Sequence, residues 1–490
     1  MTAPLTLAGR ETIVGSTAYI RPAIVSASTR EMLLGHYPAL RQDDRLRSLL
    51  GALISSTFVE DGTHRVILPY TTVAWAVGMR HNSSRFRMGQ WLERLSSAGI
   101  DLDVQKGNYR TGRATTVHVV LPEEVQHSLD YDNQRLAMRD LQNMVLLATG
   151  EPFTEASRCK MLEAEQKVLA VSPDPGPPKH PAQPLLECLA SQPTNAINKI
   201  IKRNMPDAIA AATQIPNDET RRCALKVLRE LGLGYRMCYE PAELSPRVHS
   251  HGPSPDRLPK AIRRTLLKGC VEIDIVATGL TIVSHFWNLR TLKGMFGTGE
   301  RIWDQILRRS HLTEADLPLL KKVVLATIYG LPKRHANAYL RDGVGSLTGL
   351  GPTGMRSIVR TKWMRELRYG VNCKLKGVRI KGYVKDVFGR VFDENLIRDV
   401  RPEKKRTDRV LMSLVIQALE LRLMLAVIPI IRSENKNSSR IRIASWLHDG
   451  LTLHFVDKKE APRQIRRIEQ AIRQAGKEIG IPVKAGHSFL

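Results

Sequence analysis

Hydrophobic and polar residues follow two periodicities along this chain, and together they predict a mixed α+β protein. Apolar residues recur at helical spacing in six long stretches, which are 86–99, 192–232, 278–290, 314–330, 407–428 and 461–480. Short β-prone runs bounded by turn residues predict a strand in 269–279, paired strands in 376–393, a hairpin in 441–455 and a last strand in 481–486. This alternation is typical of an antiparallel sheet backed by helices.

Residues 1–170 have the pattern of a small nucleic-acid-binding domain. A helix in 86–99, with Gly99 as its stop, precedes two β-prone runs around the basic turn "QKGNYRTGR". This order resembles the helix and wing of a winged-helix fold. Six basic residues would then meet phosphates, namely Arg80, Arg85, Arg87, Lys106, Arg110 and Arg113. The alternative is a helical hairpin followed by an ordinary β-hairpin.

A proline-rich segment divides the chain. "VSPDPGPPKHPAQP", residues 171–184, carries six prolines and a glycine, which prevent regular structure and predict an extended linker. The larger part, 185–490, contains an apolar stretch at 410–431 that is long enough to cross a membrane. Gln417, Glu420 and Arg422 lie inside this stretch and would be costly in lipid, so we expect a buried core helix.

Charge narrows the class of partner. The 490 residues have a formal net charge of +26, with 42% hydrophobic and 25% charged residues, as in a soluble protein with a polyanionic partner. Nucleic acid is the first candidate, although ribosome-associated and membrane-surface proteins share such a charge. The six scattered cysteines lack zinc spacing and predict reduced thiols in the cytoplasm. The start lacks a signal-peptide core; it is Ser/Thr-rich like a transit peptide, although Glu11 argues against one.

Two aspartates lie within apolar, strand-like sequence. Asp274 ends the run "VEID", and Asp449 lies in "WLHDGLTLHF". Asp-Gly between two β-prone runs is first of all a hairpin signal, so Asp449 can be a simple turn former. A buried carboxylate must however be paired, hydrogen-bonded or metal-bound. Two carboxylates on neighbouring strands would hold two divalent cations about 4 Å apart, which is the arrangement for phosphoryl transfer.

The stretch "LPLLKKVVLATIYG", 317–330, predicts a helix that presents a positive charge and an aromatic ring together. Lys321 and Tyr329 are eight residues apart and lie near one helical face, and Lys322 and Tyr329 also share a face. A lysine there would neutralise triphosphate charge, and an aromatic would pack against a base or sugar. Gly330 would allow close approach of the chain. Tyr329 as a plain core aromatic is the alternative.

Asp in a strand, Lys-x7-Tyr-Gly on a helix and His-Asp at a hairpin together resemble motifs A, B and C of the family A DNA polymerases and the phage-type single-subunit RNA polymerases. The resemblance covers about residues 190–490 and implies a right-hand fold of palm, fingers and thumb. It implies that Asp274, Asp449 and the backbone of Ile275 bind metal, and that Lys321, with Lys322 as the neighbouring choice, binds phosphate. It places Tyr329 and Gly330 beside the nucleotide and His448 near the primer end.

Weaker matches extend the resemblance. Arg247, in "SPRVHSHGPSPDRLP", takes the place of a minor-groove arginine, and Arg409, Ser413 and Gln417 share one helical face that would contact primer and template. The implied domains are a winged-helix-like domain (1–170), a linker (171–184) and a polymerase domain (185–490). Within the last, the thumb is about 190–240, the palm about 241–290 with 370–490, and the fingers about 291–369.

The resemblance also implies partners and cofactors. We expect a template-directed nucleotidyltransferase that uses two Mg²⁺, for which Mn²⁺ would substitute, and binds template, primer or product and nucleoside triphosphates. We expect a monomeric cytoplasmic protein, associated with the nucleoid or a mobile element, without a membrane partner. Leu317 stands where the family usually has an arginine, so Lys322, Lys333 or Arg334 would supply part of the triphosphate contacts.

Gly279 bears on whether the enzyme uses ribonucleotides or deoxyribonucleotides. It lies five residues after Asp274, where family A DNA polymerases typically carry a glutamate that blocks the ribose 2′-OH and the RNA polymerases carry glycine. The sequence therefore favours an RNA-synthesising or primase-like enzyme. A compact plasmid or phage replicative DNA polymerase is the alternative, and a glycine chosen for helix packing would carry no such meaning. An inactive nucleic-acid-binding module and a basic structural protein are the alternatives from other classes.

Overall fold

The computed structural model describes most of the chain in two compact units. The described residues are 22–56, 66–67, 73–74, 76–77, 87–105, 115–170, 180–192, 195–234, 237–242, 244–251, 253–330, 358–400, 407–438 and 440–490. The first unit takes its residues from 1–178, 194–238 and 250–269. The second unit takes its residues from 179–193, 239–249 and 270–490.

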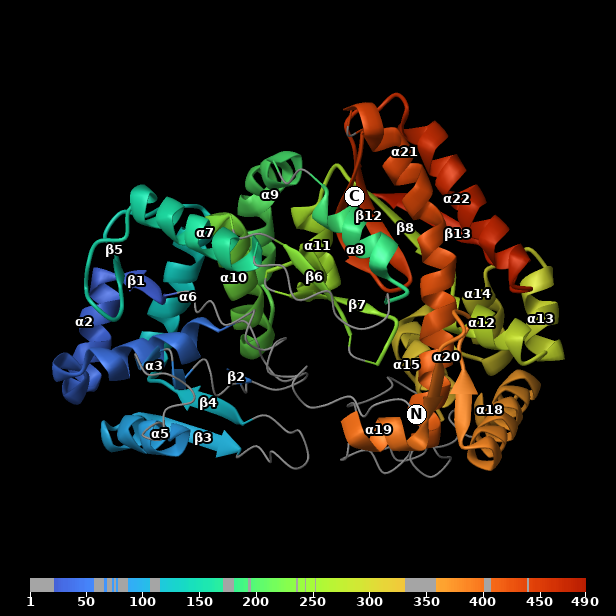
Figure 1. Cartoon of the computed structure of the whole chain (residues 1–490), viewed down its shortest axis with the longest axis horizontal. Coiled ribbons are helices and arrows are strands. Elements are labelled where there is room, and N and C mark those ends of the chain that lie inside the picture. The colour runs from blue at the N-terminus through green and yellow to red at the C-terminus, as the bar shows by residue number, and fades with distance from the viewer. Residues whose placement is uncertain are drawn as a thin grey trace, which may run out of the picture. The chain divides into compact units, whose positions relative to one another are not determined.

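The first unit is mainly helical (Figure 1). Its elements are β1 (Ile24–Ser26), α2 (Ala27–His36), α3 (Asp44–Ser55), β2 (Val66–Ile67), α5 (Met88–Ser97), β3 (Asp101–Gln105), β4 (Thr116–Val120), α6 (Glu123–Ala137), β5 (Met144–Leu146), α7 (Glu155–Ala170), α9 (Asn195–Thr213), α10 (Asp218–Leu233) and α11 (Lys260–Leu266). Local caps fix several helix starts: Ser26 accepts from the backbone of Thr29, and Asp43 accepts from the first N–H groups of α3.

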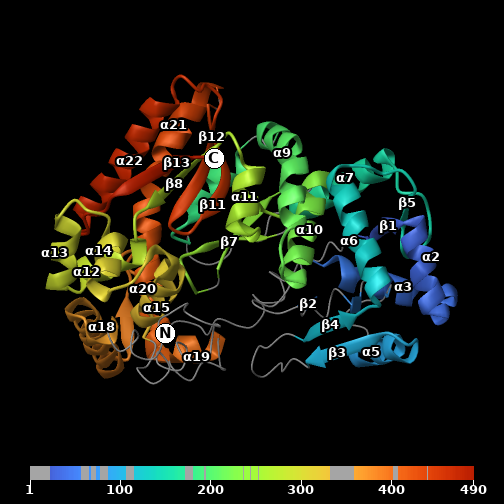
Figure 2. The same ribbon diagram turned by 180° about the vertical axis from the view of Figure 1, so that it is seen from behind.

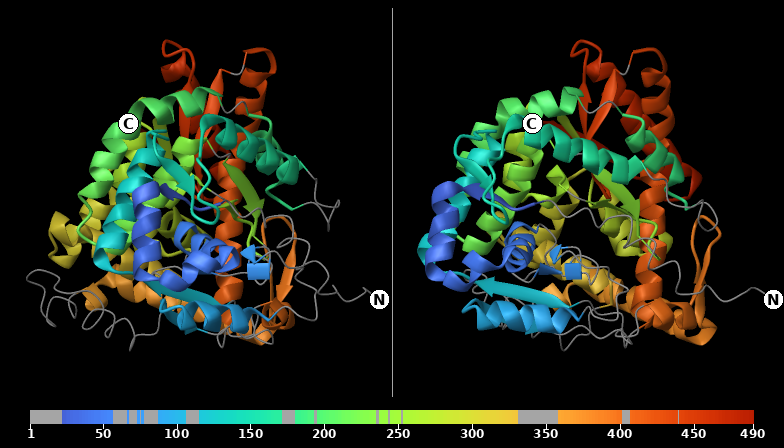
Figure 3. Two further views of the ribbon diagram at one scale, coloured as in Figure 1. Left: turned by 90° about the vertical axis from the view of Figure 1, so that its left-hand side faces the viewer. Right: turned by 60° about the vertical axis from the view of Figure 1, so that its left-hand side comes forward.

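The first unit contains a small antiparallel sheet, in which β2 precedes α5 in the chain and β3 and β4 follow it. The strand order is β2-β4-β3, and β3 pairs with β4 from Asp101 opposite Val120 to Gln105 opposite Thr116. Helix α5 contacts β3, as the side views show (Figure 3). Gly99 has φ +91° and ends the helix, as the sequence predicts. The predicted phosphate-binding residues Arg80, Arg85, Lys106, Arg110 and Arg113 lie outside the described residues, and only Arg87 of that set is placed, next to α5.

The helical stretch expected at 192–232 is divided in two. Helix α9 ends at Thr213, and α10 begins after Asn217, whose side-chain oxygen accepts from the backbone N–H of Thr220. An N-cap asparagine favours non-helical backbone at its own position, so it starts a new helix rather than continuing the previous one.

The second unit contains the sheet that carries both aspartates. Its elements are α8 (Gln183–Ala190), β6 (Cys238–Pro241), β7 (Val248–His251), β8 (Val271–Ile275), α12 (Thr278–Phe286), α13 (Arg290–Gly297), α14 (Ile302–Ser310), α15 (Leu317–Ile328), α18 (Lys362–Lys381), β9 (Tyr383–Lys385), β10 (Val391–Asp393), α19 (Glu394–Val400), α20 (Thr407–Met424), α21 (Ile428–Ser438), β11 (Ile441–Leu447), β12 (Gly450–Phe455), α22 (Ala461–Glu478) and β13 (Ala485–Phe489). Residues 239–249 of the β6–β7 pair belong to this unit.

The central sheet has the order β11-β12-β8-β13 and is antiparallel throughout. Helices α21 and α22 lie along it, and α20 runs beside them (Figures 1 and 2). Buried residues of the sheet and these helices, such as Ile273, Leu451 and Ile468, belong to one hydrophobic core. The expected α+β class with an antiparallel sheet backed by helices is therefore confirmed. The palm, fingers, thumb and domain boundaries, and the winged-helix assignment, stay predictions.

The long apolar helix is a core element. Among the described residues, the stretch Thr407–Asn435 has the length and composition of a membrane span, and 61% of its most apolar window is buried in the protein. A short 3₁₀ turn, Leu425–Val427, separates α20 from α21 within it. The burial agrees with the predicted core helix. The six cysteines are all free, as expected.

Two strand predictions were wrong in extent. Residues 376–381 continue α18, and only β9 and β10 form strands in the region expected to be paired from 376 to 393. Helix α18 ends at Gly382, which has φ +71° and supplies the left-handed C-cap. The last strand is Ala485–Phe489 rather than 481–486, and it pairs with β8 from Ala485 opposite Ile275 to Phe489 opposite Val271.

Candidate active site

The two aspartates that the sequence singles out lie on adjoining strands. Gly450, the residue after Asp449, is directly opposite Asp274 in the β12–β8 pair, and the carbonyl oxygen of Asp449 accepts a hydrogen bond from the backbone N–H of Ile275 at 3.1 Å. Opposed residues of antiparallel strands have Cα atoms about 4.5–5.5 Å apart, so the two aspartate Cα atoms lie within roughly 7 Å. Asp274 is exposed and Asp449 is half-buried. The fold thus brings the backbones of these two acids together at a solvent-accessible sheet end.

Glycine flanks Asp274 on both neighbouring strands. Gly450 of β12 and Gly486 of β13 are both opposite it in the sheet. Side chains of opposed residues share one face, so neither neighbouring strand places a side chain beside the Asp274 carboxylate. The space on the two sides is unequal: a Cβ at Gly450 would lie 2.8 Å from the Ile273 carbonyl oxygen and 3.2 Å from Asp274 Oδ1, while one at Gly486 would meet only Val276, at 3.9 Å.

A sharp turn after β8 brings a hydroxyl to the same place. Ala277 has φ +50°, a left-handed conformation that is uncommon for a residue with a side chain and is found at constrained sites. It is followed by Thr278, whose hydroxyl donates to the carbonyl of Ile275 at 2.8 Å and lies 3.3 Å from Asp449 Oδ2. Sequence reasoning missed Thr278. A threonine at the first position of a helix that follows the strand was the available signal.

His448 is a neutral histidine beside Asp449. Burial lowers its pKa to about 3, and the positive charge of Arg247 and the neighbouring His249 act in the same direction. The rings of His448 and His249 meet edge to face at 5.2 Å between centroids. The Nδ1 atom of His448 is buried and makes no hydrogen bond within the described part of the chain.

Arg247 and Gln417, expected to contact primer or template, are linked through Ser245. The Ser245 hydroxyl donates to Gln417 Oε1 at 2.6 Å and accepts from the backbone N–H of Arg247 at 3.1 Å. The Arg247 guanidinium also binds Glu420, at 2.8 Å between Nη2 and Oε2. Two connections therefore hold the segment around Arg247 against α20.

Tyr329 joins the same group of side chains. It follows α15, and burial raises its pKa to about 12, with the negative charge of Glu420 adding to the effect and Arg247 opposing it. The phenol is therefore a protonated donor at neutral pH. The next residue, Gly330, has φ +83°, and a Cβ there would lie 3.2 Å from Cγ of Arg409. Arg409 thus passes close to the backbone that follows α15.

Sequence reasoning assigned neither Glu420 nor Ser245 of this group. Glu420 is 5% exposed, and burial raises its pKa while Arg247 lowers it. In the sequence its charge served only as an argument against a membrane span. A glutamate inside a buried apolar helix needs a partner, so its position in this helix could have identified it as part of a polar cluster.

The two candidate phosphate-binding lysines differ in environment. Lys321 is half-buried and its ammonium lies 5.3 Å from the centroid of the Trp303 ring, which is a cation–π contact, whereas Lys322 is exposed. Leu325, one turn after Lys321, faces Gly279 of α12: a Cβ on Gly279 would meet Leu325 at 3.4 Å. Gly279 is thus turned toward α15. Lys333 and Arg334 lie outside the described residues.

The donor set at the two strands fits a hard divalent cation. Two carboxylates and the carbonyl of Ile275 are oxygen donors, which Mg²⁺ and Mn²⁺ prefer. Asp274 is exposed, and a Cβ on the β13 side, at Gly486, would meet only Val276 at 3.9 Å, so a cation and its waters have access from that side. No group of three or more His, Cys, Asp or Glu side chains gathers as a metal site among the residues that the structure describes. Such a pair of carboxylates leaves coordination positions for water and substrate phosphate, as Mg²⁺ sites in phosphoryl transfer usually do.

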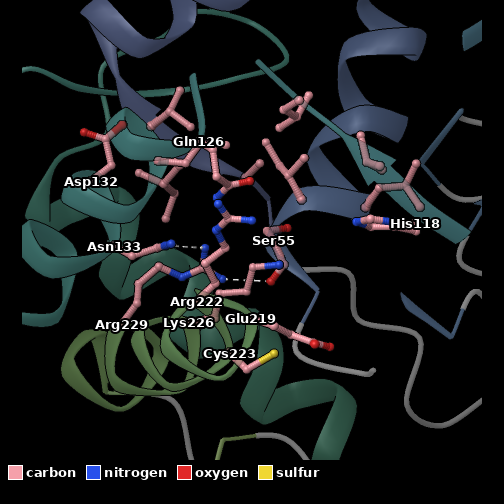
Figure 4. Close-up of a pocket in the computed structure, with 18 residues that line it drawn as sticks. Ser55, His118, Gln126, Asp132, Asn133, Glu219, Arg222, Cys223, Lys226 and Arg229 are labelled. Carbon is pink, nitrogen blue, oxygen red and sulfur yellow. Dashed lines mark hydrogen bonds between the residues drawn. The ribbon is translucent and has the colours of Figure 1, made fainter. Parts of the chain in front are cut away.

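A separate cavity of about 90 Å³ lies inside the first unit (Figure 4). Arg229 crosses it and donates to Asn133 at 3.1 Å and to the Ser55 carbonyl at 2.9 Å, and Figure 4 marks both bonds. Arg222 lies 3.6 Å from Asp130, and the Lys226 ammonium donates to the Ser56 carbonyl at 3.4 Å. Because these cationic groups already have partners within the protein, we assign no ligand to this cavity.

Lys226, which lines the cavity, should make stability depend on pH. Burial lowers its pKa from 10.5 to about 8. Between pH 8 and 10.5 the unfolded chain binds a proton that the folded chain has released, so the free energy of unfolding should rise with pH over this window, on the order of 1–3 kcal/mol. Lys226→Met should remove that slope and raise the melting temperature at pH 7. Denaturation from pH 7 to 10.5 tests this, with the exposed Lys199→Met of α9 as control. Equal slopes in wild type and Lys226→Met would contradict it.

Comparisons with known proteins add little at this level of similarity. No family model matches the chain, and no curated protein sequence matches it. Among solved structures, it is similar to the POL domain of Pol1 from M. smegmatis, in complex with DNA primer-template and dNTP. The two chains share 14% identity with a TM-score of 0.46, over 73% of this chain and 78% of that chain. A likeness this weak carries no functional inference, so the function is argued from the site itself.

Proposed function

We propose that this chain is a template-directed nucleotidyltransferase, a nucleic-acid polymerase that works with two divalent cations. The observation that carries the proposal is the register of β8 and β12. It places Gly450 opposite Asp274, so that Asp449, the residue before Gly450, lies near Asp274 at an open sheet end. The net charge of +26 supports a polyanionic substrate. Helix α15, which carries Lys321 and Lys322, packs against α12, the helix that follows β8. This packing supports the proposal that a nucleoside triphosphate binds beside the two aspartates.

Each side chain would have a distinct task. Asp274, Asp449 and the Ile275 carbonyl would hold the cations, which when bound lower the pKa of an attacking hydroxyl and stabilise phosphate oxygens. Lys321 would neutralise triphosphate charge, with Lys322 as the exposed neighbour. The Tyr329 ring would pack beside the nucleotide. Arg247 would donate hydrogen bonds to the primer or template strand.

The remaining predicted residues fit supporting tasks in the same proposal. His448, neutral at physiological pH, would contact the primer end without adding positive charge. Gln417 and Arg409 of α20 would contact primer or template, and Gly330 would keep the backbone close to the nucleotide. Neutral hydrogen-bonding groups orient a bound nucleic-acid strand, while Lys and Arg contribute affinity for the strand that falls as salt rises.

The direct test is primer extension by the purified chain. Labelled primer on DNA and on RNA templates is incubated with Mg²⁺ or Mn²⁺ and either ribonucleotides or deoxyribonucleotides, and each template is also tested without primer. We expect products whose sequence follows the template. Nucleic-acid binding without extension on any template would favour instead the inactive binding module.

Sugar choice is the finer part of the proposal. We propose that ribonucleotides are accepted, because position 279 has no side chain to meet a 2′-OH; a replicative DNA polymerase of plasmid or phage type is the alternative. Gly279→Glu should shift the ratio of catalytic efficiencies toward deoxyribonucleotides, by about tenfold or more, since a carboxylate would then lie between α12 and α15. Single-nucleotide incorporation with matched ribo- and deoxyribonucleotides measures the ratio.

Gly279→Ala is the matched control for that substitution. Its Cβ would meet Leu325 at 3.4 Å and Ile328 at 3.8 Å, contacts that the two side chains can accommodate, and it adds no group that reaches a sugar. We expect it to fold normally and to keep the wild-type sugar ratio. If Gly279→Glu folds and its ratio equals that of Gly279→Ala, position 279 does not select the sugar.

The first unit would supply nucleic-acid recognition. The order of α5, β3 and β4, with β2 as the third strand beside β4, supports a winged-helix-like domain at 1–170 that recognises an origin or promoter. We further propose a monomer in the cytoplasm, bound to the nucleoid or a mobile element and not to a membrane. Binding should weaken steeply as salt rises, because phosphate contacts release counterions.

A further inference from the structure

Glu420 holds Arg247 through a buried ion pair. The carboxylate oxygen Oε2 accepts from Nη2 of Arg247 at 2.8 Å, and the exposed fractions of the two side chains are 6% and 26%. Gln417, one turn earlier on α20, accepts from Ser245, which itself accepts from the backbone of Arg247. The main chain and the side chain of Arg247 are therefore both tied to a single helix.

This ion pair lies where three elements of the candidate site meet. Burial raises the pKa of Glu420, Arg247 lowers it, and the charge of Asp449, which follows β11 in the hairpin turn, raises it further. Burial raises the pKa of Tyr329, at the end of α15, and the charge of Glu420 raises it further while that of Arg247 lowers it. Burial lowers the pKa of His448, and the charge of Arg247 lowers it further. The guanidinium thus lies among the hairpin that carries Asp449, the helix that carries Lys321, and α20.

The pair leaves part of the guanidinium unused. A guanidinium has five N–H donors in a fixed plane. The contact with Glu420 uses one N–H of Nη2, and Nε is buried, so the donors that remain for a strand are the two on Nη1 and the second on Nη2. A buried carboxylate would be costly without its cationic partner, so Glu420 keeps the guanidinium in this orientation rather than letting it move freely.

We propose that Glu420 is a positioning residue of the candidate active site: its carboxylate anchors one edge of the Arg247 guanidinium so that the remaining N–H donors meet a nucleic-acid strand bound beside Asp274 and Asp449. The inference rests on the proposed polymerase function. It assigns Glu420 a role in strand placement, and it makes α20 the support for Arg247.

The test compares extension by wild type, Glu420→Gln and Arg247→Ala, with steady-state parameters for primer-template and for nucleotide. Glu420→Gln keeps the shape and removes the charge. We expect its catalytic efficiency for primer-template to fall by about 10- to 100-fold, mostly as a higher KM, because small misplacements of a contact cost rates of that order. The KM for nucleotide should change by less than about threefold. In an Arg247→Ala background, Glu420→Gln should have little further effect.

Matched variants separate positioning from stability. Glu434→Gln removes a glutamate that pairs with Arg467 elsewhere in the second unit, and it should leave both KM values unchanged. Ser245→Ala loosens the other tie to α20 without changing a charge, and a smaller rise in KM for primer-template is expected. It is the variant to use if Glu420→Gln does not fold.

The outcomes distinguish this inference from the proposed function. A wild-type chain that extends no primer overturns both. If wild type extends and Glu420→Gln, folded by its melting curve, matches Glu434→Gln in both KM values, the positioning role alone is overturned. Additive effects of Glu420→Gln and Arg247→Ala would overturn it too, since a residue that acts through Arg247 has no target once the guanidinium is gone.

Discussion

Asp449→Ala and Asp274→Ala should each abolish primer extension, with a fall in kcat of about 10³-fold or more. That factor corresponds to about 4 kcal/mol of lost transition-state stabilisation, a normal amount when a two-cation site loses one carboxylate ligand. Neither change should unfold the protein. Asp274 is exposed, and within the described part of the chain the Asp449 side chain accepts a hydrogen bond of 3.3 Å from Thr278. Gel-based extension under single-turnover conditions, with a melting curve for each variant, measures the effect.

Asp304→Ala is the control for these substitutions. Asp304 lies on α14 in the same unit, is about half exposed, and has a long ion pair of 3.9 Å with Arg301. It should extend primers like wild type. Primer-template affinity measured without divalent cations should also be unchanged or stronger in the Asp274 and Asp449 variants, because a negative charge is removed near phosphates. Normal extension by either variant would show that the site is assigned to the wrong residues.

Local patterns in the sequence were sufficient to predict the elements that carry the site. Asp-Gly between alternating runs predicts the β11–β12 hairpin, and the 3.6-residue pattern predicts α15, α20 and α22, all close to their observed bounds. The pairing of β12 with β8 is different. Nothing in either strand alone specifies its partner far along the chain, and the expectation came from the resemblance of the motifs.

Errors of the sequence reading arise where two local patterns fit the same residues. The run Val378–Ile380 suits a strand by composition, but α18 continues through it because its apolar residues Leu367, Val371 and Leu375 reach the core and Gly382 supplies the stop. Glu420, Thr278 and Ser245 were not predicted as site residues for another reason. Each acts through a tertiary contact with a residue far along the chain or after a turn, so its role has no periodicity to detect.

Gly450→Ala should damage both the fold near the site and the chemistry. A Cβ at this position would lie 2.8 Å from the Ile273 carbonyl oxygen, a separation that real Cβ atoms essentially never show, and 3.2 Å from Asp274 Oδ1. Since the carbonyl belongs to the backbone of β8, the two strands must separate. Overpacking of this kind costs about 1–3 kcal/mol. The same shift moves Asp449 away from Asp274, so extension should fall by about tenfold or more beyond any loss of folded protein.

Gly486→Ala supplies the comparison that isolates the cause. Gly486 is opposite the same aspartate on the other side of β8, but its added Cβ would meet only Val276 at 3.9 Å, an ordinary contact. Melting temperature and single-turnover extension should therefore fall in Gly450→Ala and stay near wild type in Gly486→Ala. If both variants lose activity while both melt normally, open space around Asp274 matters more than the close approach of β12 to β8. If Gly450→Ala matches wild type in both measurements, the spacing of the two carboxylates does not depend on this glycine.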